Sequence, residues 1–193
     1  MIVATERRMT LQEFLTYDDG TDRRYELVDG ILVPMGTEAS VNISITFFLV
    51  QAFLQILGYH RLGNKTHLEV RSRYATVRDP DLVIHSEDSA AALAGRSEAC
   101  LTLNDPNPLI AIEIVSPGTE SKPNYQRDYV QKPTEYADRG IGEMWQIDPK
   151  REWVKVGTLT DEEYQFKTFR DDDAIVSVTF PELTLTAAQI LGA

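Results

Sequence analysis

Two carboxylates lie in or beside stretches that otherwise predict buried strands. Glu113 interrupts the apolar run of residues 109–115, and Asp81 opens a second apolar run at residues 82–84. An ionised carboxylate is costly to bury unless a counter-charge or a metal ion compensates it. Two acidic side chains on neighbouring buried strands supply the oxygen ligands that a hard divalent cation prefers. The pattern therefore predicts a metal site formed by Asp81 and Glu113.

These residues also have simpler interpretations. Asp81 follows a proline and could cap a turn. Glu113 could form a buried ion pair with Lys132 or an arginine, which would explain its charge without a metal. Lys132 could be a solvated helix lysine, and Tyr136 is more typical of a core aromatic with a satisfied hydroxyl. The alternatives stay open on the sequence alone, although the presence of both Asp81 and Glu113 favours the metal site.

Hydrophobic periodicity predicts the elements that must position these residues. Glu26 lies on the first arm of a hairpin at residues 25–33, which turns at Asp29-Gly30. Thr10 and Glu13 have the spacing of a capping box at the first helix. The predicted helices span residues 9–15, 41–58, 125–139 and 186–191. The predicted strands outside the hairpin span residues 67–71, 81–85, 109–115, 143–148, 153–159, 164–169 and 175–180.

The order of these elements predicts an α/β (α+β) fold. We expect a mixed central sheet flanked by helices, with an N-terminal hairpin and a C-terminal antiparallel meander. Residues 67–71 should pair with residues 81–85 through a turn, residues 87–107 should form a surface excursion, and residues 117–123 should form a loop. The 193 residues suffice for one domain spanning residues 1–193.

Composition limits the classes of partner. The formal net charge of −11 and the pI near 4.7 argue against non-specific adhesion to nucleic acid or anionic membrane. Carboxylates that bind a metal add to this negative count, so a nuclease remains compatible with it. Cys100 is a lone cysteine, which predicts a reducing, cytoplasmic location. The N-terminus has no apolar signal core, and polar residues interrupt residues 43–57, so no membrane span is expected.

An ordered set of short motifs extends along most of the chain. The set comprises Tyr25 to Gly30 (YELVDG), Pro80-Asp81, Glu113 followed by Ser116-Pro117, Asp128-x-x-x-Lys132-x-x-x-Tyr136, Gly140 to Trp145 (GIGEMW) and Asp148-Pro149. With these motifs the chain resembles the Uma-type family of restriction endonuclease-like proteins, in the PD-(D/E)xK nuclease superfamily. The resemblance runs from about Thr10 to the C-terminus.

The resemblance implies a restriction-endonuclease-like core and a metal-dependent reaction. Asp81, Glu113 and the backbone carbonyl of Ile114 would hold Mg²⁺ or Mn²⁺. The metal would polarise a phosphodiester and lower the pKa of a bound water, so that hydroxide is available near neutral pH. Nucleic acid, DNA before RNA, is the implied substrate. A homodimer that cuts two strands is the expected assembly.

The resemblance also implies roles for a lysine and a second glutamate. The superfamily pattern has a lysine two residues after the acid, but Val115 occupies that place here. Lys132, in the following helix, would instead orient the water or stabilise charge on the phosphate. Glu26 would be a third ligand or a water-positioning group. An ion pair of Glu26 within the hairpin, with Arg23 or Arg24, is the competing interpretation.

Two departures from the family pattern bear on activity. Pro133 follows Lys132 directly, and a proline inside a helix removes a hydrogen bond and kinks the backbone. Asn42 stands where relatives often carry a histidine, and an amide cannot shuttle a proton. Both changes keep a second hypothesis open, a catalytically inactive relative that acts as a binding or assembly module. A hydrolase of small phosphate esters is a third hypothesis.

Overall fold

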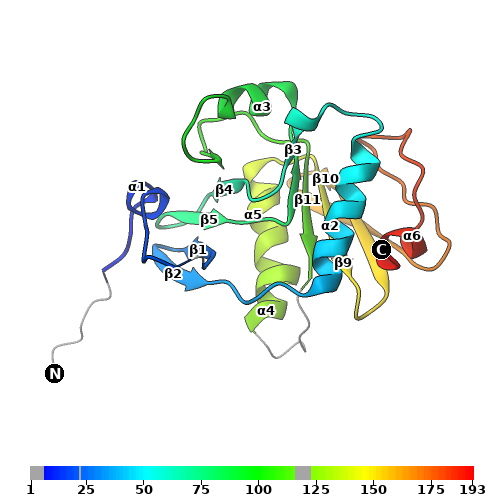
Figure 1. The fold of residues 1–193 in the computed structure, drawn as a ribbon, viewed down its shortest axis with the longest axis horizontal. Coiled ribbons are helices and arrows are strands. Elements are labelled where there is room, and N and C mark those ends of the chain that lie inside the picture. Colours follow the sequence, from blue (N-terminus) through cyan, green and yellow to red (C-terminus); the bar gives the residue numbers. More distant parts are fainter. Residues whose placement is uncertain (1–6, 22, 116–122) are drawn as a thin grey trace.

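The computed structural model describes residues 7–21, 23–115 and 123–193, whose strands form two sheets (Figure 1). A five-stranded sheet has the order β2-β1-β5-β4-β7, and a six-stranded sheet has the order β11-β10-β9-β8-β6-β3. The smaller sheet contains β1 (Tyr25–Val28), β2 (Ile31–Pro34), β4 (His67–Val70), β5 (Thr76–Arg78) and β7 (Cys100–Leu101). The larger sheet contains β3 (Leu62–Gly63), β6 (Leu82–Ile84), β8 (Ile110–Ile114), β9 (Glu143–Asp148), β10 (Trp153–Thr160) and β11 (Glu163–Phe169).

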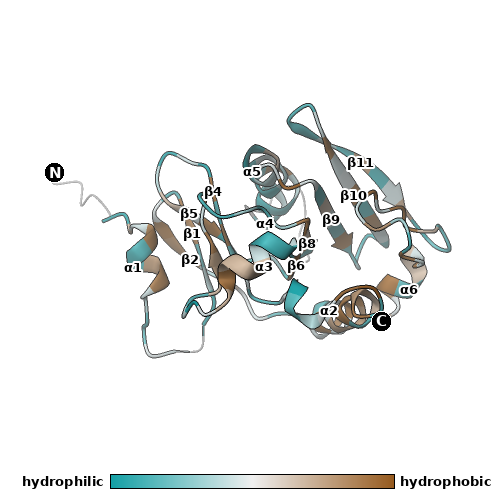
Figure 2. Cartoon of the chain, turned by 90° about the horizontal axis from the view of Figure 1, so that it is seen from above, coloured by the Kyte–Doolittle hydropathy of each residue, from teal (hydrophilic) through white to brown (hydrophobic). Residues whose placement is uncertain are grey.

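Helices cover both faces of the six-stranded sheet (Figure 2). The helices of the described residues are α1 (Leu11–Leu15), α2 (Ser40–Phe53), η1 (Tyr59–Arg61), α3 (Glu87–Leu93), α4 (Pro123–Gln126), η2 (Arg127–Gln131), α5 (Lys132–Arg139) and α6 (Ala187–Leu191), of which α1 lies beside the smaller sheet. Helices α2 and α6 lie on one face, and α4 and α5 lie on the other. Within the described ranges, no helix is long and apolar enough to cross a bilayer. The expected mixed α/β architecture, with helices flanking a mixed sheet, is confirmed.

Side-chain alternation along β8 assigns its residues to two separate cores. Ile110, Ile112 and Ile114 belong to the core cluster that α2 covers. Ala111 belongs to the cluster that contains Tyr136 of α5. Successive side chains of a strand point to opposite faces, so Glu113 shares the α5 face with Ala111. The one carboxylate of this strand therefore faces the helix that carries the candidate lysine.

Several local predictions are confirmed. Thr10 and Glu13 form the capping box of α1. Asp29 and Gly30 both have positive φ, 50° and 80°, which is the conformation a two-residue hairpin turn requires. Helix α5 ends at Gly140, whose φ of 89° is left-handed. The loop predicted at residues 117–123 falls almost entirely outside the described residues.

The expected pairing of residues 67–71 with 81–85 is wrong. Strand β4 pairs with β5, whereas β6 pairs with β3 and β8 in the other sheet. Pro80 stands between β5 and β6, and proline cannot donate to a strand ladder. The chain therefore leaves the first sheet at this proline and enters the second.

Three other predictions need correction. Helix α2 ends at Phe53 and not at residue 58, because the next turn tightens to hydrogen bonds three residues apart. The excursion at residues 87–107 is not wholly superficial, since β7 within it is buried and pairs with β4. Residues 175–180 are not a strand. Two backbone N–H groups there, of Val178 and Thr179, donate to the carboxylate of Glu143 at 3.0 Å instead of to a ladder.

Helix α4, the π-turn η2 and helix α5 follow one another without a break in helical backbone. Lys132 has φ −58° and ψ −43°, and its N–H donates to the carbonyl of Arg127, five residues earlier. A π-turn is a one-residue insertion into an α-helix, and it changes the hydrogen-bond register just before Pro133. The proline therefore stands at the start of α5, where its missing N–H is tolerated.

Candidate active site

Antiparallel pairing of β6 with β8 brings the two predicted carboxylates together. Leu82 is registered with Ile112. In an antiparallel pair, Asp81, one residue before Leu82, therefore lies opposite Glu113, one residue after Ile112. The Oδ2 atom of Asp81 accepts a hydrogen bond of 2.6 Å from the N–H of Ile114. The structure thus brings together Asp81, Glu113 and Ile114, the three residues expected to hold the metal.

Glu113 is 4% exposed, and residues of α5 satisfy both of its carboxylate oxygens. Lys132 Nζ donates to Oε2 at 2.7 Å, and the hydroxyl of Tyr136 donates to Oε1 at 2.6 Å. Lys132 and Tyr136 are four residues apart, so they lie on the same face of the helix. The buried ion pair considered for Glu113 therefore exists, and the Tyr136 hydroxyl is satisfied as expected of a core aromatic.

Glu26 provides the second contact of Lys132. Lys132 Nζ lies 3.1 Å from Glu26 Oε1, and Arg78 Nη1 donates to Glu26 Oε2 at 3.0 Å. Arg78 also forms a two-point contact with Glu135, at 2.6 and 2.7 Å. Lys132 is only 2% exposed, so it is held between two carboxylates and away from water. The solvated-lysine interpretation is wrong.

The alternative partner expected for Glu26 in its own hairpin is also wrong. Leu27 is registered with Val77, so Arg78 lies across the β1–β5 pair from Glu26. A residue directly opposite on a paired strand is closer than the residue two positions away on the same face of the same strand. Arg24 pairs with Asp79, at 2.6 Å between Nη2 and Oδ2.

The charges of the site follow from its burial. Burial raises the pKa of Asp81 to about 6 and also raises the pKa of Glu113, while the Lys132 ammonium opposes both shifts and favours the ionised Glu113 carboxylate of the ion pair. Burial alone would lower the pKa of Lys132, but the carboxylates of Glu113 and Glu26 outweigh it and raise the pKa. Burial acts against ionisation of Glu26 too, yet Lys132 and Arg78 lower its pKa to about 2. At neutral pH, Lys132 is therefore charged and Glu26 is ionised.

Asn42, the second departure from the family pattern, lies against the predicted ligands. It is 5% exposed in the first turn of α2, and its Nδ2 atom lies 3.3 Å from the carbonyl oxygen of Ile114. An amide at this place donates to the carbonyl that was expected to bind the metal. Ser116 and Pro117, which completed the Glu113 motif, lie outside the described residues.

The donor set suits Mg²⁺ in its chemistry. Mg²⁺ commonly uses one or two protein carboxylates and completes its coordination with water and phosphate oxygens. Asp81 and Glu113 supply two carboxylates side by side. Both Glu113 oxygens already accept hydrogen bonds, so ion binding would exchange one of these bonds for the metal. No group of three or more His, Cys, Asp or Glu side chains suited to a metal occurs in the described part of the chain.

Two buried residues next to the candidate site were not predicted from the sequence. Arg78 is fully buried on β5, and Gln146, registered with Glu113, donates to the backbone carbonyl of Asp128 at 2.8 Å. Arg78 ends the short strand β5, between Val77 and Asp79, so no apolar run marked it as a buried charge. No local signal identified Gln146, because its role depends on the pairing of β8 with β9.

Fold and site together define a mixed α/β protein in which an aspartate just before one strand and a glutamate on the adjacent strand lie beside a buried lysine. A family model, Uma2, described as "Putative restriction endonuclease", matches residues 11–188. The chain belongs to this family. A crystal structure from Anabaena variabilis ATCC 29413, of a "putative nuclease belonging to DUF820", shares the fold with a TM-score of 0.69. It is 19% identical and covers 95% of this chain and 98% of its own. No curated protein matches the chain.

Proposed function

We propose that the protein is a metal-dependent endonuclease that hydrolyses phosphodiester bonds of nucleic acid, with Asp81 and Glu113 as its metal ligands. One observation carries the proposal. The ammonium of Lys132 lies 2.7 Å from the carboxylate of Glu113, which is the neighbour of Asp81 across two paired strands. Family membership adds the expectation of a nuclease.

The side chains of the site have distinct tasks in this proposal. A divalent cation, Mg²⁺ or Mn²⁺, would supply Lewis-acid activation of water and phosphate. Lys132 stays protonated, so it stabilises negative charge that develops on the phosphate. Glu26 contacts Lys132 and is itself fixed by Arg78, which makes Glu26 a positioning residue and not a third ligand. Tyr136 orients Glu113.

The proposed substrate is nucleic acid, with DNA first. A net charge of −11 repels a polyanion at long range, so binding must depend on the metal and on local cations. Assays with DNA, RNA and a small phosphate ester in parallel would identify the substrate class. Cleavage of the ester alone would favour the small-molecule hydrolase.

A specific observation supports the second candidate, a catalytically inactive binding or assembly module. Lys132 and Tyr136 saturate both oxygens of Glu113, and Glu26 completes the contacts of Lys132. This network is complete as an internal ion-pair cluster and needs no metal for its stability.

Calorimetric titration of Mn²⁺ and Mg²⁺ tests the first candidate against the second. We expect sub-millimolar binding to the native protein and loss of binding in Glu113→Gln. The matched control is Asp148→Asn, because Asp148 is also a buried acid that accepts hydrogen bonds from a tyrosine, Tyr129, and a cation, Arg151. The control should bind metal as the native protein does. Native protein that binds neither ion would favour the module.

The homodimer also stays a prediction. Strand β11 is at one edge of the six-stranded sheet and β3 at the other. Sedimentation analysis should give twice the chain mass of 21.8 kDa, and a monomer at all accessible concentrations would contradict the prediction.

A further inference from the structure

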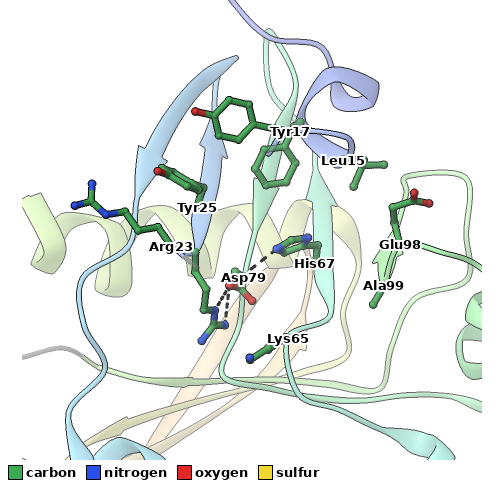
Figure 3. Close-up of a pocket in the computed structure, with 11 residues that line it drawn as sticks. Leu15, Tyr17, Arg23, Tyr25, Lys65, His67, Asp79, Glu98 and Ala99 are labelled. Atoms are coloured by element: carbon green, nitrogen blue, oxygen red, sulfur yellow. Dashed lines mark hydrogen bonds and ion pairs between the residues drawn. The ribbon is translucent and has the colours of Figure 1, made fainter. Parts of the chain in front are cut away.

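A cavity lies next to the strands that carry Glu26 and Arg78, because their chain neighbours Tyr25 and Asp79 line it. It has a volume of about 340 Å³, in the range of small-ligand sites. Helix α1, the segment before β1, the start of β4, the end of β5 and the residues before β7 line it (Figure 3). Its principal lining residues are Tyr17, Arg23, Tyr25, Lys65, His67 and Asp79.

Asp79 is the most informative group of this cavity. Its side chain is 1% exposed, and Arg24 binds only one of its oxygens, Oδ2, at 2.6 Å. His67 Nε2 lies 4.0 Å from the same oxygen. The other oxygen, Oδ1, makes no hydrogen bond within the part of the chain that the structure describes. Figure 3 shows Asp79 beside His67, with Tyr17 and Tyr25 above it and Lys65 below it.

An unpartnered buried carboxylate oxygen is rare and unfavourable, so it calls for a hydrogen-bond donor. A donor group on a ligand would supply the hydrogen bond that the described residues do not give to Asp79 Oδ1. The ligand is not a simple cation, because the lining holds three cationic side chains, of Arg23, Arg24 and Lys65, against two carboxylates, of Asp79 and Glu98. An anionic ligand with an N–H donor would match both the cationic lining and the free acceptor oxygen of Asp79.

The remaining walls are aromatic. Tyr17 is 41% exposed, and its ring meets that of Tyr25 edge-on, with centroids 5.6 Å apart. Phe14 packs on His67 with ring centroids 5.4 Å apart. Nucleobases stack on such rings, and arginine and lysine bind the phosphates that accompany the bases. Phosphate, flat base and N–H donor occur together in a nucleotide.

We propose that this cavity binds a single nucleotide whose base carries an exocyclic amino group. The amino group of cytosine, adenine or guanine would donate to Asp79 Oδ1, while Lys65, which lies near Asp79 in Figure 3, would contact the phosphate. Uracil fits less well, because its one N–H is flanked by two carbonyl acceptors. The inference deepens the proposed nucleic-acid function and rests on it, since it assigns a base-recognition subsite next to the proposed cleavage site.

The cavity is joined to that site through the backbone. The N–H of Asp79 donates to Glu26 Oε1 at 3.4 Å, and Glu26 contacts Lys132 at 3.1 Å. Asp79 also lies only two residues before Asp81. A nucleotide held at Asp79 would therefore lie close to the residues proposed to cleave the chain.

Calorimetric titration of CMP, AMP, GMP and UMP into the full chain, with a metal chelator present, tests the inference. We expect the three amino-bearing nucleotides to bind, with UMP about tenfold weaker. Inorganic phosphate should compete poorly. Equal binding of UMP, or equal competition by phosphate, would reduce the cavity to an anion site and overturn the inference.

Two variants separate the cavity from the stability of the protein. Ala99→Phe fills the cavity from its exposed rim and leaves Asp79 and Arg24 paired, so nucleotide binding should be lost. Ala94→Phe is the control, an exposed alanine outside the lining, and should bind as the native protein does. Asp79→Asn should lose the preference over UMP. Binding by Ala99→Phe at native affinity would overturn the inference.

The chelator keeps this test independent of the metal titration. Nucleotide binding without metal binding would support nucleotide recognition by the cavity but refute the nuclease, and with it the role of the cavity in cleavage. Metal binding and cleavage without any nucleotide binding would support the nuclease and refute nucleotide recognition by the cavity.

Discussion

Glu113 and Lys132 depend on each other because water reaches neither of them. Their exposed fractions are 4% and 2%, and the ammonium has a second carboxylate, Glu26, at 3.1 Å. Removal of one partner from a buried ion pair leaves the other charge uncompensated. Lys132 compensates two carboxylates and Glu113 only one cation, so the lysine is the more critical member.

Lys132→Met should therefore lower the free energy of unfolding by about 3–5 kcal/mol. Glu113→Gln should cost less, because Lys132 keeps Glu26. Urea unfolding measures the free energy of unfolding of both variants. The double variant removes both charges, so it should recover part of the stability that Lys132→Met loses. A Lys132→Met protein as stable as the native one would show that the pair contributes little.

His85 gives the clearest pH dependence of stability. It is 2% exposed, and burial together with the nearby Arg61 lowers its pKa to about 4 from an ordinary 6.5. The fold therefore favours the neutral ring. The stabilisation is complete above pH 6.5 and is lost as the pH falls toward 4, by at most about 3 kcal/mol.

His85→Gln should remove this part of the acid sensitivity when unfolding is followed between pH 4 and 7. His60→Gln is the control, because His60 has a side chain that is 56% exposed. The control should keep the native pH profile. Identical pH profiles of stability for His85→Gln and the native protein would show that His85 is not the source of this acid sensitivity.

At the scale of elements, the π-turn η2 explains how Pro133 and Lys132 coexist. Its wider register places the proline at the start of α5, while Lys132 and Tyr136 still reach Glu113. The proline is therefore compatible with the local backbone and is not a defect of the site.

Pro133→Ala should accordingly destabilise the protein slightly, by about 0.4–1 kcal/mol, because proline restricts the unfolded chain. A strained proline would behave in the opposite way, and its replacement would stabilise the protein by up to about 3 kcal/mol. Chemical unfolding distinguishes the two signs. Metal affinity should not change.

At the scale of the whole molecule, the negative charge makes nucleic-acid binding depend on a divalent ion. We expect labelled DNA to show binding by fluorescence anisotropy when Ca²⁺ replaces Mg²⁺, and little binding with a chelator. Glu113→Gln should bind poorly in both conditions, and Asp148→Asn should follow the native protein. Tight binding in the chelator would indicate a cationic surface that acts without the metal.

The sequence by itself determined the local parts of the candidate site. The apolar runs around Glu113 and Asp81 identified both carboxylates, and four-residue spacing placed Lys132 and Tyr136 on one helix face. These predictions succeeded because strand alternation and helical repeat are properties of neighbouring residues. The capping box of α1 and the Asp29-Gly30 turn were predictable for the same reason.

Only the tertiary structure decided which strands pair and which charges meet. Strand β6 belongs to the larger sheet, Arg78 and not Arg24 binds Glu26, and a glutamate side chain replaces the strand expected at residues 175–180. Asp79 and its cavity also became visible only in three dimensions. These contacts join residues far apart in the chain, and periodicity carries no information about such partners.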